Sequence, residues 1–180
     1  MRVIGMVVAA RRHAVEEAFV ATGADFDVMY RHEYPILVRL AYALCGRRDV
    51  AEELVQDAMA KTLARWSKVR EYDSPGAFVR RVLLHDISST IRRRRVELKS
   101  LIRLRGSSSD EWTIDPDVDE FWRLVRTLPT RQAQVVALYY GDQQSTVETA
   151  ELLGLSEGTV RATLAHARDA LRAQLKEEDR

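Results

Sequence analysis

The side chains best suited to bind a ligand in this 180-residue chain are arginines and small residues between Thr146 and Leu171. Apolar residues recur there at helical spacing and predict one buried helix face, made of Val160, Leu164, Ala167 and Leu171. The opposite face would carry Gly158, Arg161, Ala162, Ala165, Arg168 and Arg172. Alanines allow a helix to approach a groove and touch thymine methyls, while arginines reach phosphates and guanine edges. The predicted chemistry is therefore noncovalent binding of DNA.

The residues just before this helix have the spacing of a helix-turn-helix. Ala150 is small enough for a second helix to cross closely, and Gly154 can adopt the left-handed backbone that ends a first helix. Ser156 is a natural N-cap for the second helix. Apolar periodicity alone would also fit an ordinary helical hairpin, but this spacing favours a DNA-binding motif.

A second basic feature closes an earlier predicted helix, Ala77 to Arg95, which follows the breakers Ser74, Pro75 and Gly76. Its predicted apolar stripe is Phe78, Val82, Ile87 and Ile91. Cations at a helix C-terminus are favourable for the helix dipole, so a solvated basic end is one interpretation. The run Arg92–Arg95 exceeds what capping requires and favours phosphate binding.

The remaining segments are also read as helices. One runs from Asp25 to Leu44 and ends at Gly46, and the next begins at Asp49 with a capping-box-like pair, Asp49 and Glu52. There are no long alternating apolar runs, so no sheet is expected. The predicted class is all-α.

The domain prediction is two small helical domains joined by a flexible linker. Residues 25–95 form the first domain and residues 117–180 the second, which holds the helix-turn-helix. Residues 96–116 lose the periodic pattern and include Gly-Ser-Ser-Ser, as a linker would. Residues 1–24 are interpreted as an N-terminal extension.

The bulk properties restrict the function. Net charge is only +1, with +4 over residues 25–95 and −2 over residues 127–180, so DNA binding depends on local placement of arginines. No apolar run approaches the roughly 18 residues needed to span a membrane, and the N-terminus makes a poor signal peptide. We expect a cytoplasmic protein with no membrane span.

Catalytic and metal motifs are not evident. His32-Glu33 lacks the second histidine of a zinc helix, and the acidic run from Asp115 has Glu120 where a calcium loop needs glycine. The single Cys45 has no partner for a disulfide. We expect no enzyme activity, no catalytic residue, no cofactor and no metal.

Three segments, in this order, resemble the extracytoplasmic-function group of bacterial sigma factors, in the sigma-70 family. They are AEELVQDAMAKTLARW, PGAFVRRVLLHDISSTIRRRR and LPTRQAQVVALYYGDQQSTVETAELLGLSEGTVRATLAHARDALR. The resemblance implies that residues 25–95 are sigma region 2, which binds core polymerase and the minus-ten element. Residues 117–180 would be sigma region 4, which binds the minus-thirty-five element.

The resemblance also implies site residues. Glu53, Gln56 and Asp57 would contact the polymerase clamp helices, and the Trp66–Ser74 loop would border unpaired minus-ten bases. The expected DNA contacts of region 2 are Arg80, Arg81, His85, Arg92, Arg93, Arg94 and Arg95. Those of region 4 are Ser156, Gly158, Thr159, Arg161, Ala162, Ala165, Arg168 and Arg172.

Three positions depart from the family pattern. His85 stands where the family often has Asn, and Ser89 where it often has Asp, so the resemblance does not determine the exact minus-ten sequence. Thr149 replaces the apolar residue that usually precedes the corner alanine. Burying that hydroxyl without a partner costs roughly 1–3 kcal/mol.

The implied function is to direct bacterial RNA polymerase to promoters and to assist melting, while the polymerase performs nucleotidyl transfer. The implied partners are the clamp helices and flap of the polymerase core and promoter DNA; whether an anti-sigma factor also binds is left open. The alternative is a free-standing helix-turn-helix regulator, and a helical adaptor that binds only protein is a third class. A dimeric regulator would leave a palindromic footprint without polymerase.

Overall fold

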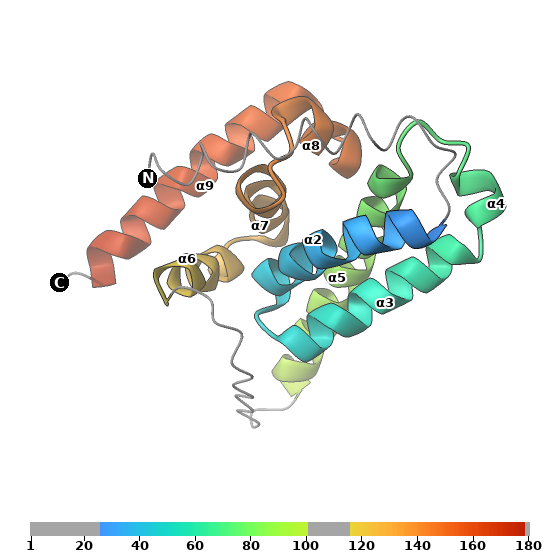
Figure 1. Ribbon diagram of the computed structural model, residues 1–180. Coiled ribbons are helices and arrows are strands. Elements are labelled where there is room, and N and C mark those ends of the chain that lie inside the picture. The colour runs from blue at the N-terminus through green and yellow to red at the C-terminus, as the bar shows by residue number, and fades with distance from the viewer. Residues whose placement is uncertain (1–25, 101–115, 179–180) are drawn as a thin grey trace.

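The structure is a computed structural model that describes residues 26–100 and 116–178, and every regular element in these ranges is a helix (Figure 1). The predicted all-α class is confirmed. The predicted extension 1–24 and residues 101–115 of the predicted linker lie outside the described residues. Among the described helices, none has the length and apolarity needed to cross a membrane.

The first unit is a helical hairpin with a third long helix packed across it. Its elements are α2 (Phe26–Cys45), α3 (Arg48–Leu63), α4 (Trp66–Val69) and α5 (Pro75–Ser100). Gly46 ends α2 with a φ of 68°, as predicted, and the left-handed backbone there favours glycine. The chain then doubles back, since the ring of Phe26 lies 5.3 Å from that of Trp66. Helix α5 packs against both α2 and α3.

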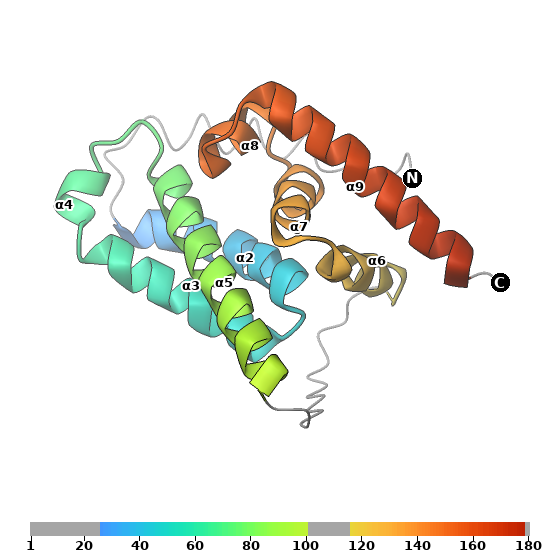
Figure 2. The same ribbon diagram turned by 180° about the vertical axis from the view of Figure 1, so that it is seen from behind.

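The second unit carries the longest helix of the C-terminal half on its outer side. Its elements are α6 (Pro116–Thr127), α7 (Thr130–Val136), the π-helical turn η1 (Ala137–Gly141), α8 (Thr146–Leu153) and α9 (Glu157–Glu178). Helix α9 packs against α6, α7 and α8. Both views place α6 and α7 between α9 and α2 (Figures 1 and 2).

The two units pack on each other, which the sequence patterns did not predict. Helix α2 contacts both α6 and η1, and α5 contacts α8. The buried apolar side chains form one continuous cluster that includes Leu37 and Leu83 from the first unit and Val125, Leu138 and Val160 from the second. In this structure the units therefore share a hydrophobic core.

Helix α5 differs from its predicted bounds at both ends. It begins at Pro75, two residues before the expected Ala77, because proline at a first helical position needs no acceptor for an N–H group. Ser74 caps it: its Oγ accepts a hydrogen bond from the Ala77 N–H at 3.2 Å. The helix continues to Ser100, five residues into the segment predicted as linker.

The buried face of α5 is also displaced from the predicted stripe. Of the predicted stripe, Ile87 is fully buried, as expected, but Phe78, Val82 and Ile91 are only half-buried. Val79 and Leu83, which were not predicted to face the core, are fully buried. The predicted helix was correct, but apolar residues form two neighbouring lines along it, one with Phe78 and Val82 and one with Val79 and Leu83. The pattern alone could not tell which of the two lines faces the core.

The predicted capping box at the start of α3 is wrong. Helix α3 begins at Arg48, and its N-cap residue, Arg47, makes no side-chain capping hydrogen bond. Asp49 pairs instead with Arg47, and Glu52 accepts a hydrogen bond from Arg48 at 2.8 Å. The neighbouring arginines thus engage both carboxylates that were expected to cap the helix.

Candidate nucleic-acid interface

The turn between α8 and α9 has the predicted helix-turn-helix geometry. Gly154 ends α8 with a φ of 64°, and the Leu155 N–H donates to the Ala150 carbonyl at 2.9 Å. A Cβ added at Gly154 would meet no atom within 4 Å, so the backbone angle, not space, favours glycine there. The Oγ of Ser156 accepts from the Thr159 N–H at 3.1 Å and caps α9, as predicted.

Helix α8 begins with a capping box that the sequence analysis missed. The Ser145 Oγ accepts from the Glu148 N–H at 3.1 Å, and Glu148 accepts from the Ser145 N–H at 2.7 Å. The Ser-x-x-Glu spacing is a known sequence signature of this arrangement. Together with Gly154 and Ser156, this box defines both ends of α8 and the start of α9.

The corner between the two helices is closed by the residues expected there. Val160 is fully buried and Ala150 is 5% exposed, while Leu164, Ala167 and Leu171 continue the buried line along α9. Thr149 is also fully buried, and its Oγ1 has no hydrogen-bond partner. The departure from the family pattern at this position therefore does bury an unpaired hydroxyl.

The outer face of α9 faces solvent. Its members, with the N-cap residue, are Ser156, Gly158, Thr159, Arg161, Ala162, Ala165, Arg168 and Arg172, and all are exposed. Each of the three arginines has a neighbour that orients it. Arg161 donates to Glu157, Arg168 donates its Nε–H to the Tyr140 Oη at 2.8 Å, and Arg172 pairs with Asp169.

Glu157 links the two helices of the motif. Its Oε1 accepts from the Thr146 hydroxyl of α8 at 2.7 Å and from the Arg161 Nη2 at 2.6 Å. The Thr146 hydrogen bond, followed by that of Arg161, holds the pKa of the Glu157 carboxyl below its ordinary value. The carboxylate therefore stays charged and orients Arg161 at the first turn of α9.

The expected polymerase contacts lie on the solvent face of α3. Glu53, Gln56 and Asp57 are exposed, whereas Leu54, Val55 and Ala58 pack into the core. The helical spacing thus separates a polar surface from a buried one, as predicted. This surface is available to a partner.

Among the basic residues of α5 whose side chains the structure describes, all but Arg80 are exposed. Arg81, His85, Arg92 and Arg93 are exposed. The side chains of Arg94 and Arg95 lie outside the described residues. Arg80 is 8% exposed, so in this arrangement it cannot reach DNA as the resemblance implied.

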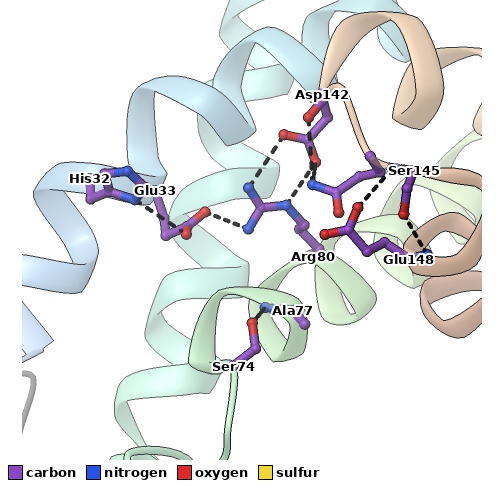
Figure 3. A network of polar contacts seen from close by, with 9 residues as sticks. His32, Glu33, Ser74, Ala77, Arg80, Asp142, Ser145 and Glu148 are labelled. Atoms are coloured by element: carbon purple, nitrogen blue, oxygen red, sulfur yellow. Dashed lines mark hydrogen bonds and ion pairs between the residues drawn. The ribbon is translucent and has the colours of Figure 1, made fainter. Parts of the chain in front are cut away.

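Arg80 is buried because carboxylates from two other segments enclose it (Figure 3). Its Nη1 donates to Glu33 of α2 at 2.6 Å, and its Nε donates to Asp142, directly after η1, at 2.7 Å. Burial opposes the charge of Arg80, but Asp142 and Glu33 more than offset it and raise the pKa of the guanidinium. No local sequence pattern indicates this cluster, because its members are 47 and 62 positions apart.

A hollow of about 490 Å³ lies at the end of α3, beside α4 and the start of α5. Its lining residues are Ala64, Arg65, Ser67, Lys68, Val69, Tyr72 and Phe78. The Tyr72 and Phe78 rings lie 5.9 Å apart, and Arg65 and Lys68 are exposed at its border. Aromatic rings beside cations suit unpaired bases and their phosphates. The predicted Trp66–Ser74 loop contains Tyr72, but Phe78 was predicted only as part of the apolar stripe of the next helix, although aromatic residues alternate with Lys and Arg in this stretch of the sequence.

Two family models match the chain: "Sigma-70 region 2" matches residues 29–97 and "Sigma-70, region 4" matches residues 119–171. The chain is 32% identical to the RNA polymerase sigma-E factor of Streptomyces coelicolor over 156 residues, which cover 86% of this chain and 88% of that protein. Identity to the sigma-E factor of Streptomyces avermitilis is 31%, over 86% and 87% of the two chains.

The fold resembles that of the sigma factor RpoE from Bartonella quintana, solved in complex with the anti-sigma factor NepR. The TM-score is 0.71 at 23% identity, over 84% of this chain and 97% of that one. CnrH, solved with the cytosolic domain of CnrY, gives a TM-score of 0.60 at 21% identity, over 89% and 94% of the two chains.

Proposed function

The chain belongs to the extracytoplasmic-function group of sigma-70 family RNA polymerase sigma factors, and we propose that its two helical units divide promoter recognition between them. As a sigma factor, it directs bacterial RNA polymerase to specific promoters and assists their melting at initiation. Its partners are RNA polymerase core and promoter DNA. Sigma factors are initiation factors, so we assign nucleotidyl transfer to the polymerase and place this protein in the cytoplasm with it.

In the proposed division, residues 25–95 form the unit that contacts polymerase and the minus-ten element. The exposed side of α3, with Glu53, Gln56 and Asp57, docks on the clamp helices. The hollow beside Tyr72 and Phe78 receives an unpaired base, since its two rings offer stacking surfaces. The exposed Arg81, His85, Arg92 and Arg93 follow the DNA backbone nearby.

Residues 117–180 form the unit that reads the minus-thirty-five element. The observation that carries this proposal is the outer face of α9, on which the small residues Gly158, Ala162 and Ala165 and the three arginines Arg161, Arg168 and Arg172 are all exposed. Such a face fits the major groove, where arginines reach guanine edges and alanines contact thymine methyls. Because the sigma factor RpoE, which has this fold, was solved in complex with the anti-sigma factor NepR, an anti-sigma factor is a further candidate partner.

The test compares DNA binding by the protein alone and by the protein bound to polymerase core. The probe is a promoter duplex selected from random-sequence DNA by the core-bound protein, and binding is followed by fluorescence anisotropy at near-physiological salt. Few phosphates can be neutralised by a chain of net charge +1, so the free protein should bind no more tightly than about 10⁻⁶ M. Binding to core should fix the separation of the two units. Once one unit has bound its DNA element, binding of the other element becomes an intramolecular step.

We therefore expect nanomolar, sequence-specific binding only with core present, and co-purification of the protein with core. A duplex with the upstream element scrambled is the control and should lose most of this affinity. Nanomolar binding by the isolated protein, with a palindromic footprint, would instead identify a free-standing regulator.

A further inference from the structure

Arg168 on the outer face of α9 is held by a residue of another element, Tyr140 of η1. The Arg168 Nε–H donates to the Tyr140 Oη at 2.8 Å, and the guanidinium carbon lies over the tyrosine ring, 5.8 Å from its centre. The hydrogen bond fixes the direction of the guanidinium, and the ring face attracts its positive charge. Two different interactions with one side chain therefore position Arg168.

The local backbone determines where Tyr140 lies. In η1 the Asp142 N–H donates to the Ala137 carbonyl at 2.9 Å, a π-helical bond that widens the last turn before α8. Leu138 in this turn is fully buried, whereas Tyr140 is 40% exposed. The ring of Tyr139 meets that of Tyr140 edge-on, with the ring centres 4.9 Å apart. Tyr140 is thus packed against its neighbour while its hydroxyl reaches α9.

Arg168 differs from the other arginines of this face in the charge of its partner. Arg161 and Arg172 each pair with a carboxylate of α9 itself, at 2.6 and 3.3 Å. The partner of Arg168 is a phenol, and within the described residues no carboxylate pairs with it. A neighbouring carboxylate offsets part of the attraction between an arginine and a phosphate, so Arg168 is the arginine of this face best suited to bind phosphate.

The position of Arg168 along α9 also fits the DNA backbone. A recognition helix places its N-terminal residues against base edges in the major groove. Arg168 lies two turns of helix beyond Arg161, about 10 Å further along the axis. The major groove is about 12 Å wide, so a helix whose first turn reaches the bases brings Arg168 to the phosphates that border the groove. Its two Nη groups can then donate to phosphate oxygens.

We infer that Tyr140 is a positioning residue: it holds the Arg168 guanidinium toward a phosphate beside the upstream element, so that this arginine is ordered before DNA binds. The inference rests on the proposed function and adds to it a residue outside the helix-turn-helix. A long side chain that is already ordered loses less conformational entropy on binding. Because phosphates occur in every sequence, Tyr140 should affect affinity and leave base preference unchanged.

The first test detects the contact in the free protein, without polymerase or DNA. Tyr140→Phe keeps the ring and removes the hydroxyl that accepts from Arg168. NMR relaxation should show an ordered Arg168 Nε–H in the parent and a more mobile one in Tyr140→Phe. Tyr139→Phe, which removes the hydroxyl of the adjacent ring, is the matched control and should leave the Arg168 signal unchanged. Equal order in the parent and in Tyr140→Phe would overturn the positioning role.

The second test measures polymerase-dependent binding to the selected duplex. Tyr140→Phe should weaken binding about three- to tenfold, and by the same factor on duplexes with single substitutions in the upstream element. Arg168→Gln should weaken it further and make the slope of log affinity against log salt shallower by about one unit. Tyr139→Phe should change binding by less than about twofold. A changed base preference in Tyr140→Phe would contradict a role at the phosphate.

The double variant shows whether Tyr140 acts through Arg168. If it does, adding Tyr140→Phe to Arg168→Gln should change binding by less than about twofold, because the two residues are coupled. The same loss in both backgrounds would overturn the inference, since a general structural effect of Tyr140 would persist without the arginine. If the parent fails to bind the duplex even with core, the proposed function fails instead. The relaxation experiment then still decides whether Tyr140 holds Arg168.

Discussion

Glu157 and Arg161 are joined at the first turn of α9 by two hydrogen bonds to one oxygen: the Glu157 Oε1 accepts from the Arg161 Nε at 3.1 Å and from its Nη2 at 2.6 Å. Thr146, the first residue of α8, donates to the same oxygen, so α8 and the first turn of α9 are connected through this carboxylate. The guanidinium nevertheless remains largely exposed. Arg161 is thus oriented by Glu157 within the protein itself, as the base-reading role proposed for it requires.

Replacing Arg161 with Ala should relax base preference at one or two adjacent positions of the upstream element. A bidentate contact between arginine and guanine contributes about 1–3 kcal/mol of discrimination. The measurement is anisotropy with core on a set of duplexes that carry single substitutions in this element. Arg172→Ala, about three turns later on the same face, is the control and should weaken all duplexes equally. A uniform loss for Arg161→Ala as well would make Arg161 a phosphate contact.

The double change Arg92→Gln and Arg93→Gln should weaken promoter complexes of every sequence. Both side chains are exposed at the far part of α5, so their loss removes two charges without disturbing the core. The slope of log affinity against log salt should become shallower by up to about two units. Thermal unfolding is the control and should hardly shift. A large fall in melting temperature with an unchanged slope would show that these arginines only stabilise the helix end.

The double change Gln56→Ala and Asp57→Ala should weaken core binding while leaving the helix content intact. Both residues lie on the exposed side of α3, and surface substitutions of this kind usually change stability by less than about 0.5 kcal/mol. Binding is measured by titrating labelled protein with core enzyme. Glu151→Ala, which removes an exposed acid on α8, is the control. Unchanged core affinity in the double variant would contradict the assignment of this surface.

Thr149→Val should raise the free energy of unfolding by about 1 kcal/mol, because it removes a fully buried hydroxyl that has no partner. The matched control is Thr62→Val. Thr62 is equally buried, but its Oγ1 donates to the Ala58 carbonyl at 2.7 Å, so this change should not stabilise the protein. Urea unfolding at fixed pH measures both. Equal effects of the two substitutions would mean that the missing hydrogen bond at Thr149 has no energetic consequence.

His32 should make stability depend on pH near neutrality. Its pKa is raised, chiefly by the hydrogen bond with Glu33, while burial and the charge of Arg80 oppose the rise. A group with a raised folded-state pKa stabilises the folded state fully below its unfolded pKa, and this contribution disappears as pH rises through the folded pKa. Urea unfolding between about pH 5 and pH 8 should therefore show a loss of stability that His32→Gln reduces. His85→Gln, at an exposed site, is the control. A parent and a His32 variant with the same pH dependence would contradict this prediction.

The helix-turn-helix could be predicted from the sequence because its determinants act over a few residues. Gly154 sets a backbone angle, Ser156 caps the helix that follows it, and Val160 returns to the corner one turn later. The Ser145–Glu148 box was equally local and was missed, although its spacing was readable. On α5, two neighbouring lines of apolar residues fit a buried face equally well, so periodicity predicted the helix but not which side of it packs against the core.

The environment of Arg80 was decided only by tertiary structure. In the sequence Arg80 and Arg81 are adjacent and chemically identical, yet Arg81 is exposed and Arg80 is enclosed by two carboxylates. Adjacent residues of an α-helix point about 100° apart, so the two side chains leave the helix in different directions. What Arg80 meets depends on Glu33 and Asp142, which are 47 and 62 positions away from it. Helix caps and hydrogen bonds between near neighbours can be predicted from residue spacing, because both partners lie within a few positions of each other. The burial of a charged side chain cannot be predicted in this way, because it depends on which distant segment packs over that side chain.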